Sequence, residues 1–206
     1  MKKLIQILLM VAIVIAAYTL IESFISPIRF QTVQKQREEV IVDRLKDIRT
    51  AQRAYKQVYQ RYTPSFDSLI NFVLNDSITY ERSLGSADDS VAVAKGLVKV
   101  EKFKMAVIDT VFGVKKLSAA DVKSFAEVPF SNGSKFILNA GDLTTQSEVV
   151  VQVFECRTPY KAYLSDLDEQ ELVNLIDEIK GLPGNRYPGL KVGSMTETTN
   201  DAGNWE

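Results

Sequence analysis

The chain has 206 residues, of which 46% are hydrophobic and 25% are charged, a composition typical of a globular protein with one or two domains. Its 25 basic and 26 acidic side chains give a net charge of -1, which argues against a nucleic-acid-binding surface. There is no histidine and only one cysteine, Cys156, so histidine-dependent catalysis, thiolate zinc clusters and internal disulfides are excluded.

The segment from Leu4 to Ile21, LIQILLMVAIVIAAYTLI, is uncharged and strongly apolar. At a rise of about 1.5 Å per residue, a helix of this length just crosses the hydrocarbon core of a bilayer. A cleaved signal peptide is the alternative, because Lys2 and Lys3 precede the segment, but the sequence that follows lacks a small-x-small cleavage pattern. We therefore predict a membrane anchor over residues 1–26, with the N-terminus in the cytoplasm.

A long amphipathic helix is predicted over residues 27–62. Pro27, preceded by a serine, is typical of a kink or a new helix start. Apolar or aromatic side chains then recur every three or four residues from Val33 to Tyr62, and only Arg37 and Gln52 interrupt this stripe. One face of the helix must therefore pack against other parts of the protein.

The stripe is wide enough to contact a partner as well. An acidic side chain at the end of a membrane helix is costly unless it lies at the interface or meets a cationic group. The residues that we expect to mediate self-assembly or partner binding lie at the end of the anchor and in the first half of the stripe: Glu22, Val33, Val40, Ile41 and Leu45. Further along the helix, we expect Tyr55, Tyr59 and Tyr62 to pack in the core of the head.

Residues 63–190 are predicted to form an α+β head, and residues 191–206 an irregular tail. Capping residues, turn residues and apolar periodicity indicate these elements: a helix over 66–74 capped by Ser65, one or two strands in the segment from Val91 onward, a helix from a capping box at Ser118 to about 126, a hairpin of strands at 135–139 and 149–156, and a helix over 166–180 capped by Ser165. The polar segment from 75 to 90 is predicted to be a loop. The predicted fold class is α+β, in which a membrane helix continues into an amphipathic helix that packs on a small antiparallel sheet with additional short helices.

The acidic clusters have explanations other than catalysis. Asp88 and Asp89 lie in the predicted polar loop. Another group lies at the start of the last predicted helix, where negative charge is favourable: Asp166, Asp168, Glu169 and Glu171. Cys156 follows a strand pattern and is expected to be buried, with no histidine to activate it. We therefore expect no catalytic residue and no enzyme activity.

The layout of a hydrophobic helix, a proline near its end, an amphipathic helix and a small β-containing head resembles that of type IV pilins and type II secretion pseudopilins. Two separated segments resemble the major pseudopilins more closely, at 27–74 and 200–206. The first segment carries residues that match this family in type and order: Asp47-Ile48, Ala54, Tyr55-Lys56, Tyr62 and Leu69. The second contains Gly203-Asn204-Trp205, which is similar to the ending of the same pseudopilins.

This resemblance implies a structural subunit of a bacterial envelope assembly or secretion system. It also implies a single pass through the inner membrane, a periplasmic C-terminal domain, and partners that are copies of the chain or other components of the system. The sequence departs from the family where Lys3 leads directly into Leu4, without the glycine, phenylalanine and glutamate of a prepilin processing site, so Glu22 is not equated with the family's conserved acid. The alternative is a single-pass adaptor subunit that does not polymerise. We expect no cofactor; calcium is the one exception that the resemblance suggests, with Asp201 and the Leu190 carbonyl as ligands.

Overall fold

The structure is a computed structural model that describes residues 2–84, 99–184 and 186–206. The chain divides into two compact units, and each is described by itself. The first unit comprises residues 1–43, 128–134 and 158–190, and the second comprises 44–127, 135–157 and 191–206. Helices and small antiparallel sheets make up the fold, which confirms the predicted α+β class.

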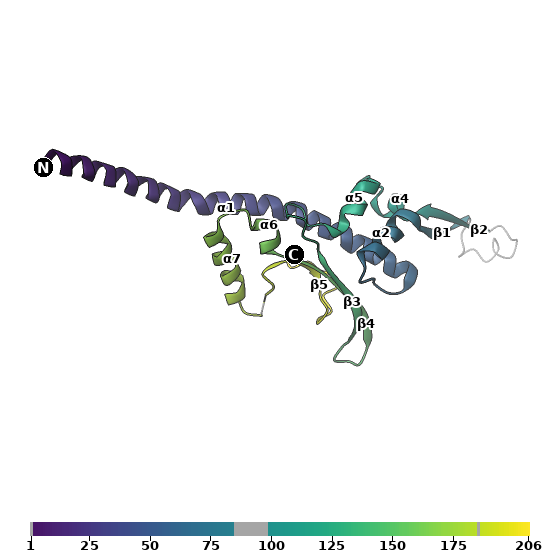
Figure 1. Ribbon diagram of the computed structural model, residues 1–206. Helices are drawn as coiled ribbons and strands as arrows, with labels where there is room; N and C mark the ends of the chain where they lie inside the picture. Colours follow the sequence, from purple (N-terminus) through teal and green to yellow (C-terminus); the bar gives the residue numbers. More distant parts are fainter. Residues whose placement is uncertain (1, 85–98, 185) are drawn as a thin grey trace. The chain divides into compact units, whose positions relative to one another are not determined.

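Helix α1, Lys2–Tyr59, is the longest element and runs without interruption through Pro27, as Figure 1 shows. Of the two alternatives predicted at Pro27, a kink or a new helix start, the new start is therefore wrong, because a single proline removes only one backbone donor from the helix. The helix ends at Tyr59 rather than at residue 62. Gln60 adopts a left-handed conformation (φ 59°) and its N–H donates to the Lys56 carbonyl at 2.8 Å, which is a common way for a helix to terminate.

In the first unit, α6 (Tyr160–Leu164) and α7 (Glu169–Gly181) lie beside α1 (Figure 1). All three helices contribute buried apolar side chains to this unit (Phe30, Ile41, Tyr160, Tyr163, Leu164, Leu172 and Ile176), and Val128 and Leu190 add two from outside them. Ser165, the predicted cap of the last helix, instead follows α6 as its C-cap. The N-cap of α7 is Asp168, whose carboxylate accepts a hydrogen bond from the Glu171 N–H at 3.1 Å.

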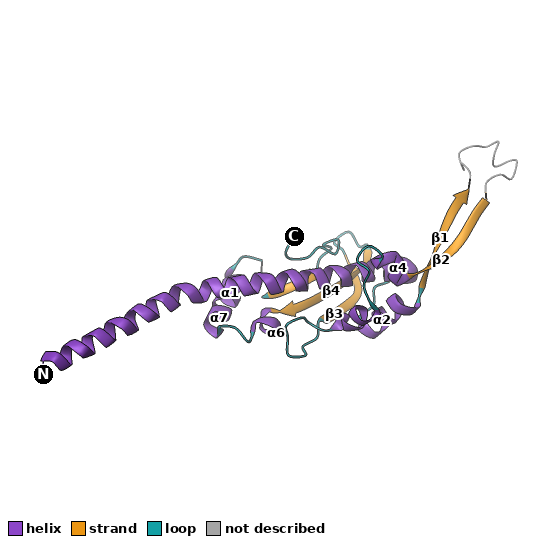
Figure 2. Cartoon of the chain, turned by 90° about the horizontal axis from the view of Figure 1, so that it is seen from above, coloured by secondary structure: helices purple, strands orange, loops and turns teal. Residues whose placement is uncertain are grey.

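The second unit contains helices α2 (Phe66–Asn75), α4 (Val107–Phe112) and α5 (Ala119–Lys123), followed by a short 3-10 helix, Ser124–Ala126. Strands β1 (Ser77–Leu84) and β2 (Lys99–Ala106) pair antiparallel as a separate ribbon, with Ser77 opposite Ala106 (Figure 2). The other sheet has the order β3-β4-β5. Its strands are β3 (Ile137–Thr144), β4 (Val150–Pro159) and β5 (Gly189–Gly193), and the ends of β4 and β5 belong to the first unit.

Local capping signals predicted several of these elements correctly. Ser65 accepts a hydrogen bond from the Ser68 N–H and caps α2. Ser118 and Asp121 form the expected capping box of α5. The predicted hairpin is confirmed as β3 and β4, which pair antiparallel with Ile137 opposite Arg157.

Other predictions were wrong where partner segments decide the conformation. Strand β1 occupies part of the expected loop, and the tail predicted over 191–206 begins with the end of β5. The apolar run that starts at Met105 is strand only as far as Ala106, because α4 begins at Val107. Asp88, Asp89 and the start of the predicted strand before residue 99 lie outside the described residues.

The two polar residues that interrupt the apolar stripe of α1 each make specific bonds. In the first unit, Arg37 donates to the Tyr163 carbonyl at 2.5 Å and forms a bidentate pair with Asp166. In the second unit, Gln52 is completely buried, and its side chain bonds both the carbonyl (2.7 Å) and the N–H (3.1 Å) of Thr63. Gln52 therefore fixes the turn that follows α1 and leaves no unsatisfied polar group at these positions.

The three tyrosines near the end of α1 have different surroundings. Tyr62 is buried against Phe154, as predicted. Tyr55 is half-buried and packs edge-on against Phe72. Tyr59 is exposed, which corrects the core prediction, because its hydroxyl donates to Asp76 at the edge of the second unit.

Candidate partner-binding site on helix α1

The first part of α1 exposes apolar side chains on every side. From Leu4 to Phe24 its large apolar side chains are each at least 53% exposed. Among the described residues, α1 is the one helix long and apolar enough to cross a membrane. None of its most apolar stretch of 18 residues is buried. Soluble monomeric proteins rarely expose a continuous apolar surface of this kind, and the length and composition of this helix are compatible with a membrane span.

Two of the five predicted partner-binding residues lie in the core instead. Ile41 and Leu45 have no exposed surface. We therefore correct the role expected for them, because a side chain enclosed by its own protein contacts no partner. Val40, the residue before Ile41 in the helix, is 46% exposed and remains accessible.

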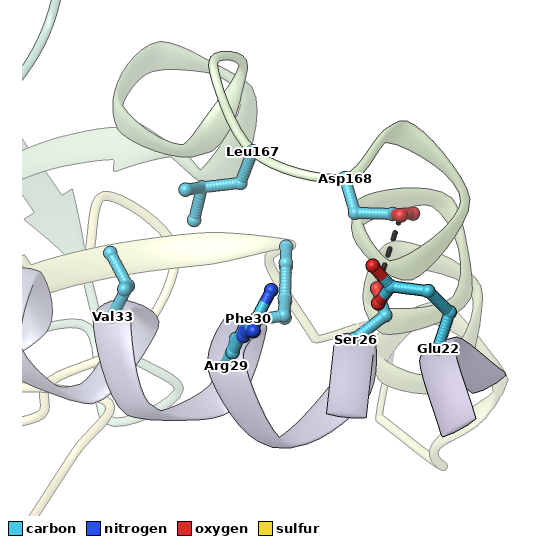
Figure 3. Close-up of a pocket in the computed structure, with 7 residues that line it drawn as sticks. All are labelled: Glu22, Ser26, Arg29, Phe30, Val33, Leu167 and Asp168. Atoms are coloured by element: carbon cyan, nitrogen blue, oxygen red, sulfur yellow. Dashed lines mark hydrogen bonds between the residues drawn. The ribbon is translucent and has the colours of Figure 1, made fainter. Parts of the chain in front are cut away.

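The other two predicted residues, Glu22 and Val33, line the same cavity in the first unit. The cavity has a volume of about 450 Å³. It lies between one face of α1 and the loop that joins α6 to α7, as Figure 3 shows. Its lining combines acidic, basic, hydroxyl and apolar side chains: Glu22, Ser26, Arg29, Phe30, Val33, Leu167 and Asp168.

The charged groups of this cavity are only partly satisfied within the protein. Ser26 donates to one carboxylate oxygen of Asp168 at 3.2 Å, a contact drawn in Figure 3. Tyr18 donates to Glu22 over a long distance of 3.4 Å. Arg29 makes no hydrogen bond or ion pair with any residue that the structure describes. The two Asp168 oxygens thus each accept one hydrogen bond, from Ser26 and from the Glu171 N–H, and keep further acceptor positions toward the cavity.

A hydrogen-bonded cluster fixes the α6–α7 segment to α1 in the first unit. The Arg37 guanidinium binds both oxygens of Asp166, at 2.5 and 2.7 Å, and lies 5.5 Å from the centre of the Phe130 ring. The hydrogen bond from Arg37 lowers the pKa of Asp166. Burial raises the pKa of Glu38, whose carboxylate accepts hydrogen bonds from Gln34 (2.8 Å) and Tyr163 (3.5 Å). These contacts position Leu167 and Asp168 at the cavity.

Asp201, the predicted calcium ligand, has cationic and phenolic partners in the second unit. One of its carboxylate oxygens accepts from Arg53 and from the Tyr62 hydroxyl, both at 2.9 Å. Burial, followed by the nearby Asp201 charge, raises the pKa of Tyr62. Within the described ranges, no group of three or more acidic or cysteine side chains could hold a metal ion. The side chain of Asp201 therefore links the C-terminal loop to α1.

The segment Gly203-Asn204-Trp205 has a structural explanation. A Cβ atom at position 203 would overlap the indole ring of Trp205, so only glycine fits there. The Asn204 side chain accepts a hydrogen bond from the Lys191 N–H at 3.0 Å, and Gly203 forms a β-bridge with Val192. These residues attach the C-terminus to the end of β5.

The remaining candidate residues also have structural roles. Cys156 is fully buried, and burial raises the pKa of its thiol, so the reactive thiolate is disfavoured. Asp166 pairs with Arg37, and Asp168 caps α7.

Sequence reasoning missed the cavity because two of its residues come from a distant loop. Glu22, Ser26, Arg29 and Val33 are spaced four, three and four residues apart, which places them on one helix face. Nothing in the sequence around Leu167 indicates that it faces them. Comparison with protein-family models, curated proteins and solved structures finds no match to this chain.

Proposed function

We propose that this protein is a membrane-anchored, pilin- or pseudopilin-like structural subunit of a bacterial envelope assembly or secretion system. Its α1 helix crosses the inner membrane once, and the α+β part lies in the periplasm. It acts by association of α1 with neighbouring copies, without catalysis.

The observation that carries this proposal is the contrast within α1. Its first part is apolar and exposed on all sides, whereas from Phe30 onward one side of the helix is buried. A helix surrounded by lipid is stable with apolar side chains on every side. A helix that packs on a soluble domain needs one apolar face toward the domain and one polar face toward water. One continuous helix with both patterns suits a subunit that is held in a membrane and carries its own folded head.

A non-polymerising adaptor is the second candidate. Ile41 and Leu45 are buried, so a neighbouring helix could contact fewer apolar side chains beyond the membrane. Val40 is the exposed apolar residue that remains in this part of the stripe, together with the half-buried Val33. This small exposed apolar surface could contact one specific partner protein as well as neighbouring copies of the chain.

Photo-crosslinking in intact cells tests both candidates. A photo-reactive residue is placed at Phe24, Ile28 or Val40, which are exposed on α1, and at buried Ile48 as the matched control. A ladder of self-adducts from the exposed positions supports the structural subunit. A single adduct with a different protein supports the adaptor.

Recovery of the chain in the soluble fraction, without adducts, would contradict both candidates.

The orientation is tested by adding protease to the periplasmic side of spheroplasts. Digestion of the α+β part supports a periplasmic location, and protection of this part contradicts it.

A further inference from the structure

We propose that the cavity between α1 and the α6–α7 loop binds the headgroup of an aminophospholipid, with its ammonium group at Glu22 and Asp168 and its phosphate at Arg29. This inference rests on the proposed function, because it requires α1 to cross a bilayer. It adds a specific lipid ligand to the proposed anchor, whereas an apolar helix of sufficient length would stay in the membrane without one.

The position of the cavity along α1 fits this ligand. The uncharged segment ends at Ile21, and Glu22 follows immediately. From Glu22 to Val33 the helix rises about 16 Å, so this stretch passes through the headgroup layer and into water. Leu167 and Asp168 reach the same stretch from the other side of the cavity (Figure 3). A lipid headgroup is the ligand that is always present at this level.

The two carboxylates favour a cation with several donors. Glu22 and Asp168 belong to different elements and line one cavity, and the hydroxyl group of Ser26 on α1 donates to Asp168. A primary ammonium has three N–H donors and can bond both carboxylates together. A metal ion fits less well, because the described residues provide no group of three acidic ligands here.

Arg29 supplies the complementary charge. Its guanidinium lines the cavity and has no partner among the residues described, so it can bind phosphate oxygens without breaking an existing contact. The Cα–Cβ bond of a helical residue tilts toward the helix N-terminus, which directs this long side chain toward the membrane. Acidic and basic groups in one cavity therefore match a zwitterionic headgroup better than a purely anionic one.

The apolar part of the lining strengthens these contacts. Phe30 is buried, and Val33 and Leu167 are half-buried beside the charged groups. Apolar walls lower the local dielectric constant and so strengthen the attraction between opposite charges. The same walls can accommodate the carbon atoms of the headgroup.

Choline lipids provide a sharp comparison, because their trimethylammonium group has the same charge but no N–H donor. The full-length protein is reconstituted in mixed micelles of phosphatidylethanolamine and phosphatidylcholine with identical acyl chains. Native mass spectrometry then gives the ratio of the two lipids that remain bound. We expect phosphatidylethanolamine to be enriched about tenfold, since one hydrogen bond to a charged group changes a binding affinity by about this factor.

Three variants separate the roles of the two charges. Glu22→Gln and Asp168→Asn should each reduce the enrichment, and asparagine at 168 still caps α7, so the fold is kept. Arg29→Gln should lower the amount of both lipids bound and leave their ratio unchanged. Glu169→Gln is the matched control, because Glu169 is exposed in the same first turn of α7 and does not line the cavity.

The outcomes distinguish this inference from the proposed function. Flotation with phosphatidylcholine vesicles first shows whether the chain inserts at all. A protein that inserts but binds both lipids equally overturns the headgroup site and leaves the anchor intact. A protein that does not float with vesicles overturns both. A self-dimer that replaces lipid at the cavity, and is lost in Glu22→Gln, would assign the site to a second copy and overturn the lipid proposal.

Discussion

The two parts of α1 are both rich in apolar residues, yet they meet different surroundings. In the first part, from Leu4 to Phe24, the large apolar side chains are exposed in all directions. In the second part, residues such as Ile48 and Ala51 are fully buried while their neighbours Thr50 and Arg53 are exposed. The arrangement of apolar residues, rather than their number, therefore shows which part is suited to lipid and which to a protein core.

A charge placed in the second part should have the largest effect. Ile48→Asp puts a carboxylate into the core of the second unit, which costs about 3–5 kcal/mol when no partner is present. This is a large fraction of the stability of a typical domain. We expect the head to lose its cooperative unfolding transition, measured by near-ultraviolet circular dichroism of the full chain in detergent.

Val40→Asp is the matched control on the same helix, since Val40 is 46% exposed. It should leave the transition within about 0.5 kcal/mol of the wild type. If the Ile48 and Val40 variants were equally stable, the assignment of Ile48 to the core and of Val40 to the exposed surface of α1 would be wrong.

A charge placed in the first part should change membrane insertion and leave folding intact. Ile15→Lys introduces a cation near the middle of the apolar segment, which costs about 2.5–3.5 kcal/mol for insertion. We expect a smaller carbonate-resistant membrane fraction and an unchanged unfolding transition. Ile28→Lys, at an exposed position beyond the anchor, is the control and should insert normally. Unfolding of the head by Ile15→Lys would show that this segment belongs to the core.

The polar bond at the end of the stripe should have an intermediate effect. Gln52→Leu keeps the volume of the side chain but leaves the buried N–H and carbonyl of Thr63 without partners. An unsatisfied buried group costs about 1–3 kcal/mol, which should lower the denaturation midpoint. Gln57→Leu, at an exposed position on the same helix, should change the midpoint little. A midpoint unchanged in both variants would mean that water replaces the Gln52 bonds.

Sequence patterns predicted the local features of this fold better than the contacts between distant segments. The Ser65 and Ser118 caps were predictable because each depends on residues three positions apart. Strand β5 was missed because Gly189–Gly193 carries no β signal of its own and is defined by pairing in the sheet. Pairing with a remote strand cannot be inferred from the segment itself.

The candidate site shows the same limit. Glu22 and Val33 were selected from helix spacing and the cost of an acid near a membrane, and both line the cavity. Ile41 and Leu45 were selected by the same spacing but are buried, because spacing identifies an apolar face without showing what covers it. Arg37 interrupted the pattern for a reason found only in the fold, its pair with Asp166.

The pair of Arg37 and Asp166 should have the smallest effect and a defined pH dependence. Because the hydrogen bond from Arg37 lowers the pKa of Asp166 in the folded state, its stabilisation is present above the unfolded pKa of about 4 and is lost as the pH falls through the lower folded value. The carboxylate is 54% exposed, so Asp166→Asn should cost less than about 1 kcal/mol at pH 7. Denaturation midpoints of the two proteins should converge toward pH 3, whereas Asp177→Asn, at an exposed position on α7, should match the wild type throughout. A difference that persists at pH 3 would show that Asp166 acts through packing rather than through charge.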